Sequence, residues 1–421
     1  MRSRFSGLWR NPDFLRLWAG QTVSLFGSQV TILALPLTAT LVLDATPVQM
    51  GLLGATGTLP FLLIGLFAGV WVDRLRRRPV LIAADLGRAV LLGSIPLAAA
   101  LDQLTMAQLY AVSLLTGFLT VFFDVAYQAF LPSLVERRQL VEGNGKLEMS
   151  NSTARVAGPG LAGALTQLLS APAAVLWDAI SFLLSALFIG SIRGPEPAPN
   201  RKAERSGIWA EVREGLRLVL RDPLLRPLAI STAAGNLCTG VVTALFVLFL
   251  VETLHLAPAV IGLISAVGSV GALVSAMLVA PVTQRLGIGR ALVTGKLLLA
   301  AGALLMPVAA GPAVVAAAVL TASRLVGTAG QVLSNVNQVS LRQATAPARL
   351  QGRVNATNRF LVWGTMPIGA LLGGLLGEAI GVRPTLAVGA VGMALAAVSV
   401  LLSAVPSVRE APEAEGEAAV A

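Results

Sequence analysis

Long runs of apolar residues, each bounded by charged residues or by Pro and Gly, repeat along the whole chain. A run of about 20 apolar residues is the length that a helix needs to cross the hydrocarbon core of a bilayer. Twelve such runs occur, at roughly residues 13–43, 48–72, 80–101, 106–132, 147–170, 173–192, 224–252, 258–283, 291–310, 313–341, 354–379 and 384–405. The pattern therefore predicts an all-α polytopic membrane protein with twelve spans.

The basic residues lie mainly in the connections between these runs, and they are distributed unevenly. Arg and Lys collect in the loops on one side, whereas the loops on the opposite side contain only Arg383. Loops rich in Arg and Lys normally face the cytoplasm. Because the number of spans is even, we expect both ends of the chain in the cytoplasm.

The most charged short connection is residues 69–81, Gly-Val-Trp-Val-Asp-Arg-Leu-Arg-Arg-Arg-Pro-Val-Leu. An Arg in the bilayer centre costs at least ~2.5 kcal/mol on insertion scales, so this segment is predicted to be an aqueous turn. Asp73 is expected at a helix end, where it accepts hydrogen bonds from backbone N–H groups and neighbouring arginines. Asp85 and Arg88 either extend this network or form a local pair, worth ~0.3 kcal/mol if wet. The predicted cytoplasmic gate comprises Gly69, Asp73, Arg74, Arg77, Arg78, Asp85, Arg88 and Arg155.

The composition agrees with a membrane protein. Of 421 residues, 55% are hydrophobic and only 12% are charged, which is too few to cover a soluble surface. The net charge of +10 comes from basic loops between apolar runs, so we expect no nucleic-acid partner. Cys238 is the only cysteine, which excludes an intrachain disulfide and a zinc site made of several cysteines. The first apolar run is too long for a signal peptide, so no cleavable signal is expected.

The two halves of the chain repeat. Pro12 and Pro223 precede spans 1 and 7, Asp73 and Gln284 follow spans 2 and 8, and both pairs are 211 residues apart. Such a repeat indicates a parallel duplication, with a substrate site expected between the halves near the membrane midplane. We expect six-helix bundles at 1–192 and 223–406, a cytoplasmic linker with an amphipathic helix at 193–222, and a disordered acidic tail at 407–421.

Polar side chains at helical spacing form stripes on spans 1, 4, 7 and 10. Residues three or four positions apart share a helix face, and in a bilayer a polar face avoids lipid. Spans 3, 6, 9 and 12 carry few polar residues and are expected to face lipid. The stripes predict a central cavity, although Ser, Thr and Asn also bond between helices for ~0.6 kcal/mol each. The candidate cavity residues are Gln21, Ser28, Thr120, Tyr127, Asn236, Thr239, Gln331 and Asn335.

Asp124 and Arg324 are ionisable residues within these stripes. An ionisable group inside a membrane is a functional candidate, so both are candidates for proton coupling. Asp124 and Asn335 are 211 residues apart, which gives one half an acid where the other has an amide. One hypothesis is that Asp124 binds and releases a proton during transport. The alternative is a fixed salt bridge from Asp124 to a basic residue such as Arg155 or Arg324.

Residues 69–81 resemble the signature of the major facilitator superfamily of secondary transporters, which lies between its helices 2 and 3. Arg76 occupies a position where that family usually has glycine, and the matching residues are Gly69, Asp73, Arg74, Arg77 and Arg78. The resemblance implies two pseudo-symmetric six-helix bundles that rock about a central site.

Residues 158–163, Gly-Pro-Gly-Leu-Ala-Gly, are similar to the antiporter motif of the same family. Gly and Pro allow close helix approach and bending, so Gly158, Pro159 and Gly163 are expected to form a hinge in helix 5. Further segments resemble the bacterial 12-helix drug:proton antiporters that include macrolide and enterobactin exporters: 122–124, 131–135, 177–182, 350–354 and 367–369. Ser113 replaces the arginine often found in helix 4 of antiporters.

These features predict a proton-coupled exporter of amphiphilic small molecules in the bacterial inner membrane, acting as a monomer. Asp124 is expected to supply charge to the site, and the cavity amides are expected to supply hydrogen bonds. The apolar walls are expected to add affinity. Alternatives are a siderophore, lipid or small-solute transporter, working by export or uptake symport, and a non-transporting membrane sensor or scaffold. Enzymatic function, cofactors and metals are not expected, because His255 is the only histidine and no phosphate-loop or metal-ligand spacing occurs. The expected partners are the substrate, protons and the lipid bilayer.

Overall fold

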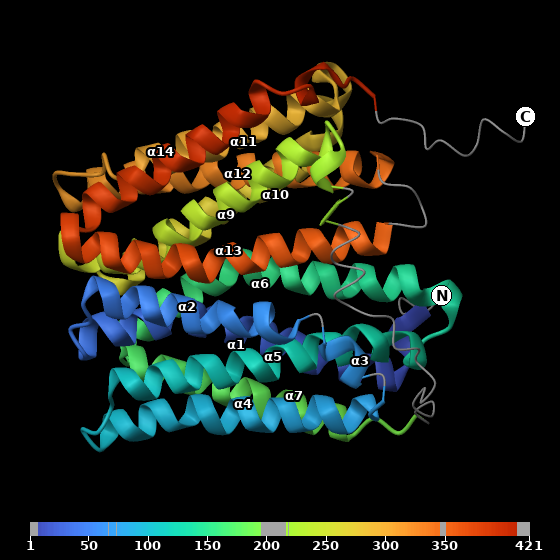
Figure 1. The fold of residues 1–421 in the computed structure, drawn as a ribbon. Helices are drawn as coiled ribbons and strands as arrows, with labels where there is room; N and C mark the ends of the chain where they lie inside the picture. The colour runs from blue at the N-terminus through green and yellow to red at the C-terminus, as the bar shows by residue number, and fades with distance from the viewer. Residues whose placement is uncertain are drawn as a thin grey trace, which may run out of the picture. The chain divides into compact units, whose positions relative to one another are not determined.

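The computed structural model describes residues 7–65, 67–72, 74–194, 216–217, 219–345 and 351–410, and it gives no side-chain environment for residues 69–70 and 351–363. The regular elements in these ranges are helical (Figure 1). The first half contains α1 (Pro12–Val42), α2 (Pro47–Ile64), α3 (Ala68–Val72), α4 (Arg77–Ala100), α5 (Met106–Leu134), α6 (Leu140–Leu168) and α7 (Ala171–Gly190). The second half contains α9 (Leu225–Leu248), α10 (Pro258–Leu286), α11 (Ile288–Leu305), α12 (Ala313–Thr345), α13 (Gln351–Ile380) and α14 (Val382–Leu401).

The helices agree with the predicted all-α membrane fold. In the described chain, 10 helices are long and apolar enough to cross a membrane, and Gly364–Ile380 of α13 is a shorter apolar stretch. The predicted span 48–72 is not continuous, because α2 ends at Ile64 and α3 begins four residues later. Gly65 lies at this break, where its N–H donates to the carbonyl of Phe61 at 3.1 Å. Glycine gains most backbone freedom outside a helix, which favours a break at this position.

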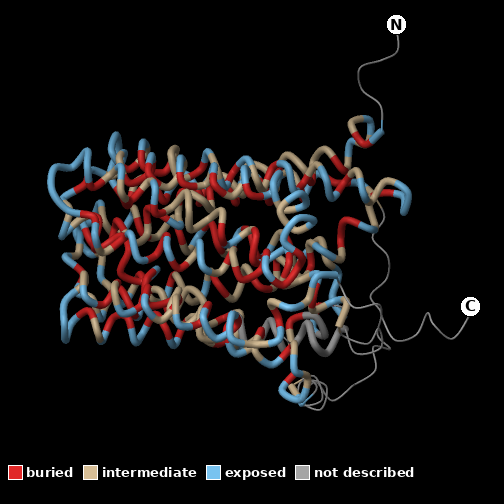
Figure 2. Tube along the Cα trace, turned by 90° about the horizontal axis from the view of Figure 1, so that it is seen from above, coloured by how far each residue is buried: buried red, intermediate tan, exposed pale blue. Residues whose placement is uncertain are grey.

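The described residues form two compact units. The N-terminal unit contains residues 7–45, 56–194 and 257–266, and the C-terminal unit contains residues 46–55, 216–256 and 267–410. In the N-terminal unit, α1 packs against α6 and α7, and α4 packs against α5 and α7 (Figure 1). In the C-terminal unit, α9 packs against α13 and α14, and α11 packs against α12 and α14. Buried and exposed positions alternate along these helices (Figure 2). The packing therefore repeats with the duplication. The domain boundaries stay predictions, since most of 193–222 and 407–421 lies outside the described residues.

Both halves begin with the same type of helix cap. The side-chain oxygen of Asn11 accepts hydrogen bonds from two backbone N–H groups of α1, both at 3.1 Å. Asp222, 211 residues later, accepts from two backbone N–H groups at the start of α9, both at 2.8 Å. The first N–H groups of a helix have no partner within the helix, so a side-chain oxygen stabilises the helix start. The repeated sequence landmark therefore has the same structural role twice.

Pairs of glycines form close helix contacts in each unit. In the N-terminal unit, a Cβ on Gly163 of α6 would lie 2.8 Å from the Cα of Gly262 in α10. In the C-terminal unit, a Cβ on Gly51 of α2 would lie 2.7 Å from the Cα of Gly374 in α13. Gly163 and Gly374 are 211 residues apart, and so are Gly51 and Gly262. The two halves thus contribute the same pair of glycine positions to helix packing.

Candidate functional site

Arg88 is at the centre of a buried cluster in the N-terminal unit. It forms an ion pair with Asp85, one turn earlier on α4, and their side chains are 5% and 0% exposed. The guanidinium carbon of Arg88 lies 4.3 Å from the ring centroid of Phe123 in α5 and 4.1 Å from that of Phe182 in α7. Asp85 and Arg88 therefore form the local pair that their spacing allows, but the pair is buried rather than exposed to solvent. Their assignment to a cytoplasmic gate stays a prediction.

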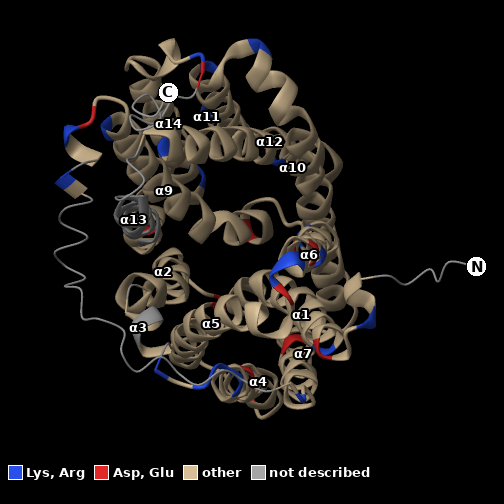
Figure 3. Ribbon diagram, turned by 90° about the vertical axis from the view of Figure 1, so that its right-hand side faces the viewer, with Lys and Arg blue, Asp and Glu red and all other residues tan. Residues whose placement is uncertain are grey.

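Two further acids complete this acid cluster. Asp124 on α5 and Asp178 on α7 both interact electrostatically with Arg88. Asp178 is 1% exposed, and it accepts hydrogen bonds from the hydroxyls of Thr31 at 2.5 Å and Ser181 at 3.0 Å. Figure 3 shows acidic residues (red) among α4, α5 and α7. In the described chain, no group of three or more His, Cys, Asp or Glu is arranged to hold a metal ion.

Four predicted cavity residues lie in the N-terminal unit. Tyr127 is next to Asp124, with which it interacts electrostatically. The hydroxyl of Tyr127 and the side-chain carbonyl of Gln21 are buried without a hydrogen-bond partner among the described residues. Thr120 donates its hydroxyl to the carbonyl one turn earlier at 2.8 Å, and Ser28 is half-buried on α1. None of these four residues belongs to the cavity described next.

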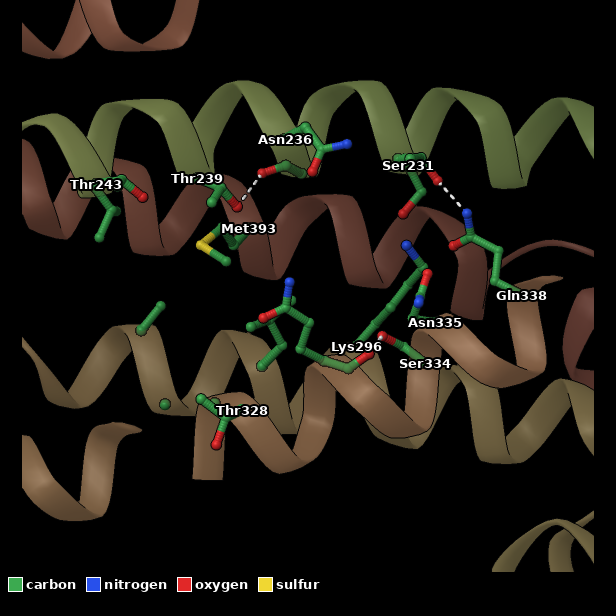
Figure 4. Close-up of a pocket in the computed structure, with 18 of the residues that line it drawn as sticks. Ser231, Asn236, Thr239, Thr243, Lys296, Thr328, Ser334, Asn335, Gln338 and Met393 are labelled. Atoms are coloured by element: carbon green, nitrogen blue, oxygen red, sulfur yellow. Dashed lines mark hydrogen bonds between the residues drawn. The ribbon is translucent and has the colours of Figure 1, made fainter. Parts of the chain in front are cut away.

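A polar cavity of about 480 Å³ lies within the C-terminal unit, between α9, α11, α12 and α14 (Figure 4). This volume is within the usual range for small-molecule sites. The polar side chains of its wall come mostly from α9 and α12, the helices of predicted spans 7 and 10. The lining includes five of the predicted site residues: Asn236, Thr239, Arg324, Gln331 and Asn335.

Three cationic side chains line this cavity: Lys296 from α11, and Arg324 and Arg342 from α12. The guanidinium carbon of Arg324 lies 4.4 Å from the ring centroid of Phe246. No ion pair joins any of the three to an acid among the described residues. Figure 4 shows Lys296 beside Asn335 in the space between α9 and α12. We call this space the cationic cavity.

Lys296 and Asp178 were not predicted as site residues. Spans 6 and 9 have few polar residues, and the sequence predicts that they face lipid. At two positions this prediction is wrong, because Asp178 is buried and Lys296 lines the cavity. A count of polar residues per span overlooks a single ionisable residue in an otherwise apolar helix. Any ionisable residue inside a membrane is nevertheless a candidate for a functional site. A second signal was available: Lys296 follows Asp85 by 211 residues.

The predicted cytoplasmic gate is described only in part. Asp73 lies outside the described residues, and the surroundings of Gly69 are not described. Arg74 is exposed and Arg77 is half-buried at the start of α4. Arg78 donates from Nε to the carbonyl of the penultimate residue of α7 at 3.2 Å, and from Nη2 to the carbonyl of the last. A basic side chain in this position is stabilising, because it hydrogen-bonds to carbonyl groups at the end of the helix.

The remaining candidates lie on α6. Arg155 is exposed and donates to Asn151 at 3.3 Å. Asp124 interacts electrostatically with Arg88, and the alternative of a fixed salt bridge from Asp124 to a basic residue such as Arg155 or Arg324 stays a prediction. Gly158 packs against the side chain of Gln29, and Pro159 lies within the helix. A hinge at Gly158, Pro159 and Gly163 stays a prediction.

Repeated helical units with a buried polar interior are typical of membrane transporters. The family model of the Major Facilitator Superfamily matches residues 17–366 and, in a second match, 228–420, so the chain belongs to this superfamily. The expectation of a multi-pass secondary transporter rather than an enzyme is therefore confirmed.

Two of the similar proteins are named as efflux proteins. Multidrug efflux pump Tap of Mycolicibacterium fortuitum is 29% identical over 387 residues, which cover 89% of this chain and 91% of Tap. Macrolide efflux protein A of Streptococcus pyogenes is 24% identical over 209 residues, covering 50% of this chain and 51% of that protein. The predicted resemblance to efflux transporters of this superfamily is therefore confirmed.

Solved transporter structures share the fold. A variant of nucleoside transporter NupG has a TM-score of 0.77 at 12% identity, covering 92% of this chain and 99% of that chain. A bacterial homologue of the iron transporter ferroportin, in its inward-facing state, has a TM-score of 0.74 at 19% identity, covering 92% and 98%. At these identities the likeness establishes the predicted major facilitator fold and nothing about substrates.

Proposed function

We propose that this transporter exports amphiphilic small molecules across the bacterial inner membrane in exchange for protons, by alternating access of its two halves. The relatives named as efflux pumps support export, and Tap matches nearly the whole chain. The positive loops support cytoplasmic termini. A monomer is sufficient for this function, because each chain has both halves of the repeat.

The observation that carries proton coupling is the acid cluster. Three carboxylates, Asp85, Asp124 and Asp178, surround the single guanidinium of Arg88. When all three acids are ionised, the cluster holds more negative than positive charge, which is costly in a low-dielectric interior. Proton binding removes this excess, so the cluster is suited to take up and release protons.

Asp124 is the proposed exchanging acid. Asp85 and Asp178 are enclosed: the side chain of Asp85 is 0% exposed and Asp178 is 1% exposed. Asp124 is only half-buried and lies beside Tyr127, whose buried hydroxyl has no hydrogen-bond partner among the described residues. A partly accessible acid exchanges protons with water more easily than an enclosed one. The motif around Asp73 is proposed to act separately, as a cytoplasmic gate.

Transport by purified protein in liposomes, with an imposed pH gradient, tests this function. Ethidium, erythromycin and pyrenebutyrate represent cationic, macrolide and anionic amphiphiles. We expect gradient-driven movement of at least one of them opposite to the protons, and Asp124→Asn is expected to reduce it to the rate without a gradient. Asp102→Asn is the matched control, because Asp102 is an exposed acid with φ of 53°, a conformation that Asn also adopts.

Movement in the same direction as the protons would indicate uptake symport rather than efflux. Unchanged gradient-driven transport by the Asp124→Asn variant would remove the proposed role of Asp124. Movement of none of the three compounds, by protein with intact helix content, would contradict the efflux proposal.

A further inference from the structure

The cationic cavity has positive charge that its own wall does not balance. Lys296, Arg324 and Arg342 line it, and neither Asp nor Glu occurs among the lining residues that the structure describes. Burying an unpaired charge in a low-dielectric interior is unfavourable, and such charges normally have a counter-charge. A ligand that brings its own negative charge would supply it.

The hydrogen-bond donors of the cavity lead to the same conclusion. The hydroxyls of Thr232, Thr239 and Thr328 donate to backbone carbonyls at 2.7, 2.8 and 2.7 Å, so their hydrogens are already used. The groups left to donate to a ligand are mainly the cations and side-chain amides such as Asn335, together with the hydroxyl of Thr243. The Nε of Arg342 is buried and has no hydrogen-bond partner among the described residues. A wall with unused cationic donors fits an oxyanion, which accepts strong charge-assisted hydrogen bonds.

Arg324 is arranged to bind such a group. Its guanidinium carbon lies over the ring of Phe246, and this cation–π contact uses the face of the guanidinium rather than its N–H groups. The planar fork of N–H donors therefore remains available for the two oxygens of a carboxylate or phosphate. Lys296 adds a point charge from the facing helix α11.

We propose that the cationic cavity binds the carboxylate or phosphate group of an acidic amphiphile. The apolar part of the ligand would contact the apolar lining residues Val242, Leu299, Met306 and Met393. This inference names the substrate class of the proposed exporter and rests on that function. It differs from a cationic-drug site, which would need an acid in the wall.

Equilibrium binding of three matched fluorescent probes tests the proposal. Pyrenebutyrate, pyrenebutanol and pyrenebutyl-trimethylammonium share one ring system and differ in charge. Binding is measured with the full chain in phosphatidylcholine nanodiscs, and empty nanodiscs give the lipid background. We expect pyrenebutyrate to bind about tenfold tighter than pyrenebutanol, the ratio for one charge-assisted hydrogen bond. Equal binding of all three probes, or tightest binding of the cation, would overturn the proposal.

Variants of the cavity locate the effect. Lys296→Gln and Arg324→Gln are each expected to weaken pyrenebutyrate about tenfold and to leave pyrenebutanol unchanged. Arg324→Lys keeps the charge and should retain part of the affinity, which a misfolded variant would not. Arg290→Gln is the matched control, because Arg290 is an exposed arginine of α11 outside the cavity. Equal weakening of all probes by the two Gln variants would show a general loss of structure and contradict a charge-specific site.

Competition distinguishes two sources of the acidic group. Displacement of pyrenebutyrate by inorganic phosphate supports a soluble anion, whereas displacement only by phosphatidylglycerol in the nanodisc supports an anionic lipid headgroup. The binding measurement needs no pH gradient. Charge-selective binding without gradient-driven transport would therefore support this site and reject the proposed proton coupling. Gradient-driven transport without charge-selective binding would support the proton coupling and reject this site.

Discussion

Asp85 and Lys296 hold equivalent positions in the two halves, 211 residues apart, yet they carry opposite charges. In the N-terminal unit, Asp85 belongs to a dry cluster in which Arg88 lies between two aromatic rings. In the C-terminal unit, Lys296 lines a cavity with two arginines. Helix packing meanwhile repeats, including the glycines at 163 and 374. The two units therefore use one backbone arrangement for different chemistry.

The difference lies in where the charges find their partners. In the N-terminal unit, Arg88 is paired with an acid inside the protein, so removing Arg88 leaves buried acids without a counter-charge. The three cations of the cationic cavity have no acidic partner among the described residues. Removing one of them therefore removes a buried charge that nothing in the wall balances. Removal of Arg88 and removal of Lys296 should thus have effects of opposite sign on stability.

The largest effect is expected at Arg88. Arg88→Met removes the counter-charge of the acid cluster, and losing one partner of a buried ion pair typically costs ~3–5 kcal/mol. The free energy of unfolding in mixed detergent micelles should fall by that amount. Arg290→Met, an exposed arginine, should change it by less than ~0.5 kcal/mol. Adding Asp85→Asn to Arg88→Met should restore part of the loss, and no recovery would mean that packing rather than charge decides the effect.

Glycine substitutions test the shared part of the comparison. Gly163→Val and Gly374→Val each place side-chain atoms where the facing helix backbone lies, and overpacking typically costs ~1–3 kcal/mol. The two variants should reduce the free energy of unfolding by similar amounts. A large difference between them would show that the packing of the halves is less symmetric than the described contacts. Gly145→Val is the control, because a Cβ on Gly145 meets nothing within 4 Å.

Asn335→Asp introduces into the C-terminal unit the acid that Asp124 provides in the N-terminal unit. The new carboxylate lies beside Lys296 and should pair with it, as close opposite charges do. Affinity for pyrenebutyrate is expected to fall about tenfold, equivalent to one charge-assisted hydrogen bond. Asn335→Gln keeps the amide and should retain more affinity. Stronger binding of pyrenebutyrate by the Asp variant would contradict an anion site.

Lys296→Met is expected to have the smallest effect, and the opposite sign to Arg88→Met. Replacing a cation that lacks an acidic partner by an apolar side chain of similar length should raise the free energy of unfolding by about 1 kcal/mol. The same unfolding measurement applies. Destabilisation by several kcal/mol, as for a broken buried pair, would show that Lys296 has a partner within the protein and would remove the contrast between the units.

Much of the fold follows from the sequence, because a membrane span needs a long apolar run and the repeat marks equivalent helices. The repeat marked the starts of spans 1 and 7 through Pro12 and Pro223, which directly follow the capping residues Asn11 and Asp222. The break at Gly65 could not be predicted, since it interrupts an apolar run without any charged residue, and glycine alone is tolerated inside membrane helices.

The candidate sites could be predicted only in part. The stripes of spans 7 and 10 contain Asn236, Gln331 and Asn335, which line the cavity. Lys296 and Asp178 are single ionisable residues in otherwise apolar helices, so no stripe marks them. Their roles depend on which neighbouring helices they face, and helical periodicity within one span does not reveal this. Arg88 was predicted, but its contacts with Phe123 and Phe182 depend on tertiary packing.

The opposite charges at Asp85 and Lys296 also limit how such a transporter can be built. A homodimer assembled from two copies of a single half would have the same side chain at both positions. It could contain two acid clusters or two cationic cavities, but not one of each. Encoding both halves in one polypeptide allows them to diverge independently, so the covalent connection permits the division of labour between the units.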